Sequence, residues 1–421
     1  MTANPDRAVP LASRSAGKVR VLALVSVLGP GLLAGLSDDD PAGITTYSVL
    51  GAGYGYRLLW VLLLSTVALV VFHNLGARMG VVTGQGLIGL IRQRYGVRAA
   101  ALAVTVLVLA NLGTTCAEFA GIAAGSELFG VSRYVSVPVA AVVVSALVLR
   151  GRFHRVEHIL MALATVFVAY VAAGLLADPD WGGAFTGLVV PTMPLTRDAV
   201  LIVTATVGTT LAPWGLSFIQ SYAVDKKLIV ADLRYERIDV VTGAVLTGVI
   251  GFFVVVACAS TLHLRGVTID SAADAAGALE PLAGGLASVL FGVGLIGAAV
   301  LAAAILPLSS AYSVCEFAGS EAALDDTFAE ASLFYVTYLV VTGVAALIVL
   351  LPGAPLIPIL VLSQVLNAIL LLPLLIFMYG ISRDRDLMGA FTATRAAAVL
   401  YLATIAFIAM CVAGLCVLGL A

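Results

Sequence analysis

The chain has 421 residues, of which 61% are hydrophobic and 11% are charged, and its formal net charge at pH 7 is −2. Soluble globular proteins carry about 25% charged residues, so this composition excludes a soluble globule and predicts a polytopic membrane protein. A net charge so close to zero gives no indication of a nucleic-acid partner. The five cysteines are scattered without a CxxC pair, which predicts neither a disulfide framework nor a zinc site.

Windows of about 20 apolar residues predict an all-α protein. Eleven membrane-spanning helices are expected, at approximately residues 21–53, 57–79, 99–129, 134–150, 156–177, 198–224, 237–263, 285–308, 331–351, 355–381 and 396–419. The first and the sixth of these spans are broken. We expect residues 1–20 to form a cytoplasmic N-terminal tail and residues 21–419 to form a single transmembrane domain.

The distribution of arginine and lysine predicts the orientation of the spans, because cytoplasmic loops of membrane proteins are enriched in both. With the N-terminus in the cytoplasm, most of the basic residues lie on the cytoplasmic side. The exceptions are Arg57, Arg133, Arg197 and Arg265. The odd number of spans then places the C-terminus on the outer side of the cytoplasmic (inner) membrane.

The first span is interrupted at residues 37–43 by the sequence Ser-Asp-Asp-Asp-Pro-Ala-Gly. Each aspartate inside the bilayer costs roughly 2.5–3.5 kcal/mol, so the three together need a compensating partner, for which a cation is the obvious choice. These aspartates are Asp38, Asp39 and Asp40. Because Pro41 lacks an N–H and Gly43 relaxes the chain, we expect this stretch to be unwound, with free carbonyl oxygens near Ser37. Such oxygens are tolerated at membrane depth only where they line a cavity or bind a ligand.

The sixth span repeats this anomaly, with Pro213 and Gly215 in the middle of an apolar helix. The two breaks are offset by five spans, an odd number, so the two halves of the chain insert in opposite senses as 5+5 inverted repeats. We expect repeat one over about residues 21–177, repeat two over about 198–381 and an extra helix over about 396–419. Interrupted helices at corresponding positions of inverted repeats indicate the midplane binding site of a transporter.

The two breaks offer only oxygen ligands. The first provides carboxylates, and the second provides hydroxyls and backbone carbonyls between Thr209 and Ala212. An oxygen-only site suits a hard divalent cation such as Mg²⁺, Mn²⁺ or Ca²⁺. The small residues Gly43, Ala212 and Gly215 leave room for the waters that Mg²⁺ tends to retain. The ion is the expected substrate, and no cofactor is predicted.

Two further polar side chains within apolar spans concern the site. Glu118, in the third span, is open to three interpretations: a proton acceptor, a group lining the permeation path, or a structural partner of a hydroxyl. Gln364, in the tenth span, either supplies an amide oxygen to the ion or binds a helix carbonyl. The four histidines lie at or near span ends, where a capping or solvated role is favoured.

Four sequence motifs, taken in order, resemble those of the Nramp metal transporters. They are Gly-Pro-Gly followed by Asp40-Pro41 in the first span, residues 77–84 after the second, residues 117–121 in the third, and Ser363-Gln364 through Pro373 to residues 387–389 around the tenth. The resemblance covers nearly all the spans and is closer still to the Nramp-related magnesium transporter branch. It implies a LeuT-like fold and import by alternating access.

The departures from the family pattern concern its ligands and its proton path. Asp40 is kept, but Gly43 stands in place of an asparagine ligand and Ala212 in place of the soft methionine ligand. Trp214 replaces a histidine, and Thr115 replaces an aspartate that serves proton transfer. The resemblance therefore implies a hard, partly hydrated ion, and it puts proton coupling in doubt because the remaining glutamate lacks its relay partners.

The sequence favours an importer of Mg²⁺, and also of Mn²⁺, without obligatory proton coupling. We expect Asp40 to be a direct ligand, while Asp39 and Asp38 bind through water or only set the local field. The main alternative is a proton-coupled Mn²⁺/Fe²⁺ importer of the wider family type. A sodium-coupled amino-acid transporter of the same fold is less favoured, because it should present small residues and backbone amides at the first break.

An enzyme is not predicted. An intramembrane aspartyl protease needs two aspartates on separate spans, including a Gly-x-Gly-Asp run, which this sequence lacks. The expected partners are divalent metal ions and the lipid bilayer, with no nucleic acid and no obligatory protein partner.

Overall fold

The computed structural model describes residues 39–149, 169–320 and 328–420. Within these ranges the chain is helical and contains no β-strand, so the prediction of an all-α protein is confirmed. The predicted tail at residues 1–20, the first half of the first span and much of the fifth span lie outside the described residues.

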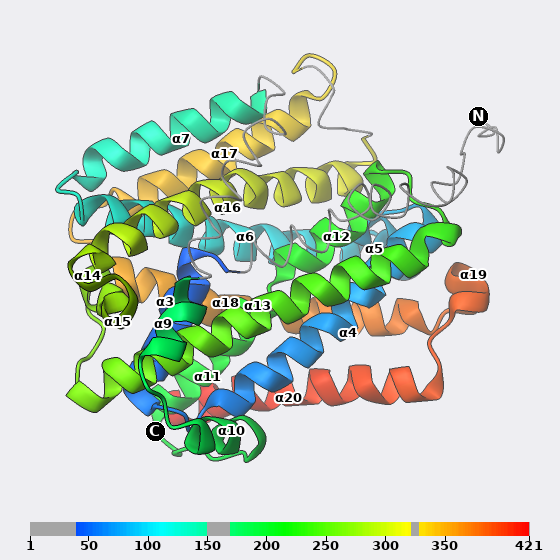
Figure 1. The fold of residues 1–421 in the computed structure, drawn as a ribbon. Coiled ribbons are helices and arrows are strands. Elements are labelled where there is room, and N and C mark those ends of the chain that lie inside the picture. Colours follow the sequence, from blue (N-terminus) through cyan, green and yellow to red (C-terminus); the bar gives the residue numbers. More distant parts are fainter. Residues whose placement is uncertain (1–38, 150–168, 321–327, 421) are drawn as a thin grey trace, which may run out of the picture.

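The helices form one bundle (Figure 1). The longer helices are α4 (Leu59–Thr83), α6 (Val97–Glu127), α7 (Arg133–Leu149), α13 (Leu233–Thr261), α16 (Ala287–Ala318), α17 (Ser332–Val349), α18 (Leu356–Ser382) and α20 (Arg395–Leu420). The shorter helices are α3 (Pro41–Tyr54), α5 (Leu87–Tyr95), α9 (Ala169–Leu176), α10 (Trp181–Val189), α11 (Arg197–Thr210), α12 (Pro213–Asp225), α14 (Ala272–Ala276), α15 (Glu280–Ala283) and α19 (Arg385–Met388). Single 3₁₀ turns occur at Val230–Asp232, His263–Arg265, Gly277–Leu279, Gly284–Leu286 and Gly389–Phe391. Figure 1 shows α20 at one edge of the bundle and α7 and α17 at the opposite edge.

Membrane insertion agrees with the lengths and surfaces of these helices. In the described part of the chain, eight helical segments are long and apolar enough to cross a membrane. Many large apolar side chains on their outer surfaces are exposed, for example Val399 on α20 and Leu347 on α17. Lipid can cover such side chains, whereas in water they would form an aggregation-prone surface. The chain is a multi-pass membrane protein, and the number of eleven spans stays a prediction.

The predicted break in the sixth span is confirmed. α11 ends at Thr210 and α12 begins at Pro213, and the backbone of Leu211 and Ala212 between them is not helical. Proline is well tolerated at the first position of a helix, because its missing N–H would have no intrahelical partner there. Pro213 therefore starts the second half-helix and does not kink a continuous one.

The prediction that residues 37–43 are unwound is wrong at its C-terminal end. α3 begins at Pro41, so the last three residues of this stretch are helical. Asp40 is the N-cap, with extended backbone at ψ 171°, and its carboxylate accepts a hydrogen bond from the N–H of Gly43. The reason is that an aspartate followed by a proline is a helix start, since the side chain caps the helix and the ring presets its first φ angle.

Candidate metal site

The two breaks are built alike where their second half-helices begin. Pro41 opens α3 and Pro213 opens α12, and in each case the preceding residue has extended backbone. The two N-caps differ in their side chains, because Asp40 carries a carboxylate whereas Ala212 carries only a methyl group. In the described part of the two breaks, negative side-chain charge therefore comes from the first one.

Two aspartates of the first break are buried. Asp39 is 2% exposed and Asp40 is 4% exposed. Within the described ranges, neither carboxylate oxygen of Asp39 has a hydrogen-bond partner. Burying an unpaired carboxylate costs free energy, so a cation, a water molecule or a proton must compensate the carboxylate of Asp39. The other two candidates at this break, Ser37 and Asp38, lie outside the described residues.

Glu118 reaches the first break from α6. Its side chain is fully buried, and in the described chain no donor bonds to either of its oxygens. It interacts directly with Asp40. The close approach of the two helices depends on Gly121, where an added Cβ would lie 2.4 Å from the Cβ of Pro41. No hydroxyl of the described residues bonds to Glu118, and the three interpretations of this side chain stay open.

The second break offers a hydroxyl and the end of a helix. The Oγ1 atom of Thr209 is buried and has no hydrogen-bond partner among the described residues. A helix leaves its last carbonyl oxygens without intrahelical partners, so the end of α11 at Thr210 presents acceptors as well. The hydroxyls of Thr210 and Tyr47 are hydrogen-bonded at 2.9 Å, which joins α11 to α3. The half-helices on either side of the site are thus tied to each other.

Gln364 on α18 belongs to a side-chain network. Its amide oxygen accepts a hydrogen bond from Asn367 at 2.9 Å, and its amide nitrogen donates to Ser363 at 3.0 Å. Asn367 is in turn hydrogen-bonded to Thr114 on α6. A carbonyl oxygen has two lone pairs, so the amide oxygen of Gln364 retains one for an ion. α18 lies directly against the second break, because an added Cβ at Gly208 would lie 1.9 Å from the Gln364 carbonyl oxygen.

The two positions that depart from the family's proton path hold groups that do not titrate. The hydroxyl of Thr115 donates to the carbonyl of Asn111 at 2.6 Å, within α6. Trp214 is 2% exposed, its ring lies beside that of Phe218, and its carbonyl accepts a hydrogen bond from Ser309 at 3.4 Å. A hydrogen bond fixes the side chain of Thr115 and packing fixes that of Trp214, and neither one can accept and release a proton near neutral pH.

The carboxylates around the first break do not form a closed cage. Across residues 39–149, 169–320 and 328–420, no three His, Cys, Asp or Glu side chains gather so that they could hold a metal ion. Asp39, Asp40 and Glu118 would therefore act together with hydroxyl oxygens, backbone oxygens and water. Such a donor set suits a hard cation that keeps part of its hydration shell.

Sequence reasoning missed the polar face of α16. The hydroxyl of Ser310 accepts a hydrogen bond from Asn111 at 3.0 Å, and the hydroxyls of Ser313 and Ser217 are hydrogen-bonded at 3.0 Å. These contacts tie α16 to α6 and α12. The signal in the sequence is a run of three serines at residues 309–313 within a long apolar helix.

The same arrangement of helices occurs in solved transporters. The crystal structure of the Eremococcus coleocola manganese transporter, in complex with an aromatic bis-isothiourea substituted compound, aligns with a TM-score of 0.77 at 18% sequence identity. The alignment covers 94% of this chain and 87% of the other. At this identity the likeness concerns the fold alone. The helical bundle with its interrupted sixth span has a LeuT-like fold.

This chain belongs to the Nramp family. Residues 31–418 match the family model described as natural resistance-associated macrophage protein-like. The divalent metal cation transporter MntH of Granulibacter bethesdensis is 28% identical over 375 residues, covering 86% of this chain and 82% of that protein. The MntH of Pectobacterium carotovorum is 28% identical over 399 residues, covering 91% of each. The predictions of an Nramp transporter and of a protein without enzymatic activity are confirmed.

Proposed function

We propose that this protein imports Mg²⁺, and also Mn²⁺, across the cytoplasmic membrane by alternating access and without obligatory proton coupling. Membership of the Nramp family supports metal-ion transport, and the relatives compared above are named divalent metal cation transporters. The choice of a hard ion rests on the carboxylate, hydroxyl and carbonyl oxygens of the two breaks, beside which one imidazole nitrogen, Nε2 of His73, lies buried against Gly215. Asp39 is buried there without a hydrogen-bond partner in the described chain, and Ala212 stands where a soft ligand would be needed.

In this proposal Asp40 binds the ion directly, through the carboxylate oxygen that does not cap α3. Asp39 and Asp38 bind it through water or set the local field. The remaining oxygens, or the space for bound water, come from Ser37, Gly43, Thr209, Ala212 and Gln364. Gly43 contributes space and a capping N–H, because it lies within the first turn of α3.

Proton coupling is not part of the proposal, because Thr115 and Trp214 cannot relay a proton. Glu118 then lines the permeation path beside Asp40. The membrane potential supplies a driving force of its own: each charge contributes about 2.3 kcal/mol per 100 mV, so a divalent cation gains about 4.6 kcal/mol on entry. This is sufficient to concentrate the ion without a second coupled ion.

The proposed topology follows the distribution of basic residues. The N-terminus is cytoplasmic and the C-terminus lies on the outer side of the inner membrane. Repeat one covers about residues 21–177, repeat two about 198–381, and the extra helix about 396–419. This arrangement can be tested by introducing a single cysteine at one or the other terminus of the protein and labelling intact cells with a thiol reagent that does not cross the membrane. Equal labelling of the two termini would contradict it.

The deciding experiment measures Mg²⁺ flux into proteoliposomes with the variant Asp40→Ala. Because Asp40 also caps α3, the loss of a cap must be separated from the loss of a ligand. Asp180 provides the matched control, since it is exposed and caps α10 by accepting from the N–H of Gly183 at 3.0 Å. Removing either cap costs about 1 kcal/mol of stability. We expect Asp40→Ala to abolish uptake and Asp180→Ala to retain it. Unchanged uptake by Asp40→Ala would refute the proposal.

A second candidate is the proton-coupled Mn²⁺/Fe²⁺ importer. It is favoured by one observation, the direct interaction of the buried Glu118 with Asp40, which is where a proton acceptor would be useful. A pH-sensitive dye enclosed in the proteoliposomes distinguishes the two candidates. Acidification of the interior in step with Mn²⁺ entry, and its loss in Glu118→Gln, would favour the coupled importer. Ion entry at constant internal pH would favour the uncoupled one.

A further inference from the structure

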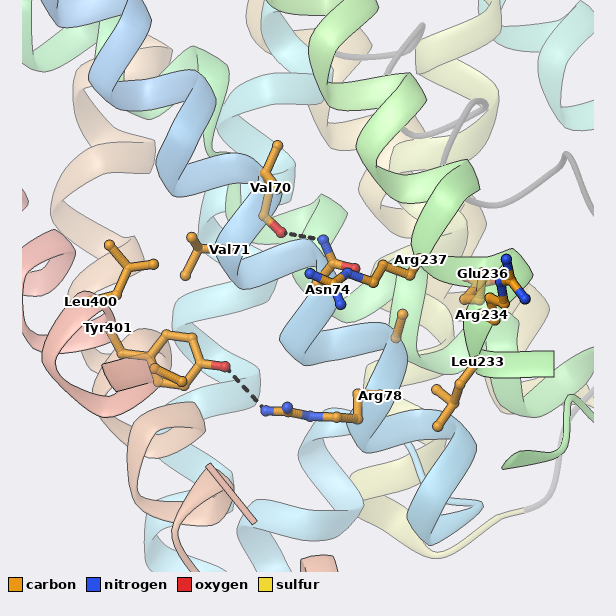
Figure 2. A pocket seen from close by; sticks show the side chains of 12 residues that line it. Val70, Val71, Asn74, Arg78, Leu233, Arg234, Glu236, Arg237, Leu400 and Tyr401 are labelled. Atoms are coloured by element: carbon orange, nitrogen blue, oxygen red, sulfur yellow. Dashed lines mark hydrogen bonds between the residues drawn. The ribbon is translucent and has the colours of Figure 1, made fainter. Parts of the chain in front are cut away.

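A cavity of about 520 Å³ lies between α4, α13 and α20, away from both helix breaks. Figure 2 shows its two kinds of lining. Val70, Val71 and Leu400 form an apolar part, and Arg78, Arg237 and Tyr401 form a polar part. Nothing in the proposed transport mechanism uses this cavity.

The polar part of the cavity has basic groups without a carboxylate partner. Nη2 of Arg78 donates to the hydroxyl of Tyr401 at 3.1 Å, and its Nε atom is buried without a hydrogen-bond partner in the described chain. No ion pair within the described ranges involves Arg78, Arg234 or Arg237, and all three arginines line the cavity. The acidic lining residue is Glu236, which Figure 2 shows beside Arg234 and away from Tyr401. The cavity therefore carries an excess of positive charge.

One wall of the cavity belongs to a helix on the lipid-facing side of the bundle. α20 forms one of its walls and lies at the edge of the bundle (Figure 1). Apolar side chains on α20 are strongly exposed, including Val399 at 67% and Met410 at 68%. The cavity also lies near helix ends: Arg78 is in the last two turns of α4, and Arg237 is in the first two turns of α13. This depth corresponds to the interface between the hydrocarbon core and the headgroups.

We propose that this cavity binds the headgroup of an anionic phospholipid. A guanidinium group can bind a phosphate through two parallel N–H···O hydrogen bonds, which makes arginine a preferred phosphate ligand in proteins. Basic pockets between transmembrane helices are sites for anionic headgroups. Val70, Val71 and Leu400 continue the cavity with a surface that suits an acyl chain. This combination selects a lipid over a soluble phosphate, because a soluble phosphate would leave the apolar part uncovered.

Tyr401 positions the phosphate-binding arginine. Its ring lies against Phe72 with centroids 5.4 Å apart, and it is only 5% exposed. Its hydroxyl therefore holds the guanidinium of Arg78 at the mouth of the cavity. Figure 2 shows Arg237 approaching from α13, next to Asn74. A phosphate between the two arginines would bridge α4 and α13.

The test uses the full-length protein purified in detergent and native mass spectrometry. The probes are dioleoyl phosphatidylglycerol, dioleoyl phosphatidylcholine and water-soluble glycerol 3-phosphate. The double variant Arg78→Gln/Arg237→Gln removes the phosphate ligands and keeps the side-chain length. Arg98→Gln is the matched control, because Arg98 is an exposed arginine of α6 that does not line the cavity.

We expect phosphatidylglycerol to bind in preference to phosphatidylcholine, and the double variant to lose roughly thirtyfold in affinity. Each single variant should lose about fivefold, which keeps the proposal testable if the double variant fails to fold. Arg98→Gln should bind like the wild type. Equal binding of the two lipids, or full binding by the single variants, would overturn the proposal. Binding of glycerol 3-phosphate as tight as that of the lipid would overturn the choice of a lipid over a soluble phosphate.

Discussion

Gly208→Ala should separate α11 from α18 at the second break. An added Cβ at Gly208 would lie 1.9 Å from the carbonyl oxygen of Gln364 and 2.7 Å from the backbone nitrogen of Ala368. Both are backbone atoms, so no side-chain rotation can relieve the overlap. Reaching even the closest tolerated separation of 3.0 Å requires the helices to move apart by about 1 Å.

Two opposing effects decide the size of the change in stability. Replacing glycine by alanine within a helix favours the helix by about 1 kcal/mol. Overpacking a close contact costs typically 1–3 kcal/mol and sometimes more. Because the overlapping atoms belong to the backbone, the cost of overpacking lies at the upper end of this range and exceeds the gain in helix propensity. We expect a net destabilisation of about 2 kcal/mol, together with a displaced Thr209 and impaired transport.

Gly343→Ala is the matched control. Gly343 is also within a helix, α17, but an added Cβ there meets no atom within 4 Å. This variant should be as stable as the wild type or slightly more stable, by up to about 1 kcal/mol. The assay is the thermal unfolding midpoint in detergent, followed by Mg²⁺ flux in proteoliposomes. If Gly208→Ala unfolds at the same temperature as Gly343→Ala and transports normally, the close contact between α11 and α18 is wrong.

Two further predictions concern contacts that hold the helices together. The carboxylate of Glu316 on α16 accepts hydrogen bonds from the N–H of Ile88 at 3.1 Å and from Ser221 at 2.7 Å. Glu316→Ala leaves both donors unpaired, so it should lower the free energy of unfolding by about 1–3 kcal/mol and with it the unfolding midpoint. It should also increase proteolysis at residues 84–96, measured as faster tryptic cleavage. Tyr47→Phe removes the hydrogen bond between α3 and α11, so it should lower the free energy of unfolding by about 0.5–1.5 kcal/mol. It should also alter the rate of uptake without changing expression. An unchanged unfolding midpoint would contradict this prediction.

The positions of the two breaks can be predicted from the sequence. The extent of the unwound stretch in the first break can be predicted only in part. A proline in an apolar run indicated an interruption at Pro41 and at Pro213. The aspartate before Pro41 is the sequence signal of a helix start, and taking it as such would have ended the unwound stretch at Asp40. Hydropathy windows also ended the eighth span at about residue 308, whereas α16 continues to Ala318. The windows detect the apolar part of a helix, and the polar last turns of α16 lie beyond it.

Contacts between distant segments could not be predicted. The close approach of Gly208 to Gln364 joins residues more than 150 positions apart, and a glycine in a helix gives no sign of which partner will pack against it. The same holds for the bond between Asn367 and Thr114. Both depend on how α6, α11 and α18 are placed in the bundle, which follows from the packing of the entire chain.

The charges of the described helix ends differ between the two breaks. The N-terminus of a helix carries a partial charge of roughly +0.5, which repels a cation. At the start of α3 the carboxylate of Asp40 offsets this charge by capping the helix, whereas the buried carboxylate of Asp39 takes no part in the capping. α12 also presents its N-terminus, but there the C-terminal end of α11, with a partial charge of roughly −0.5, lies two residues away. The second break is therefore close to neutral without any acidic side chain, and a divalent cation between the breaks would depend on the aspartates of the first.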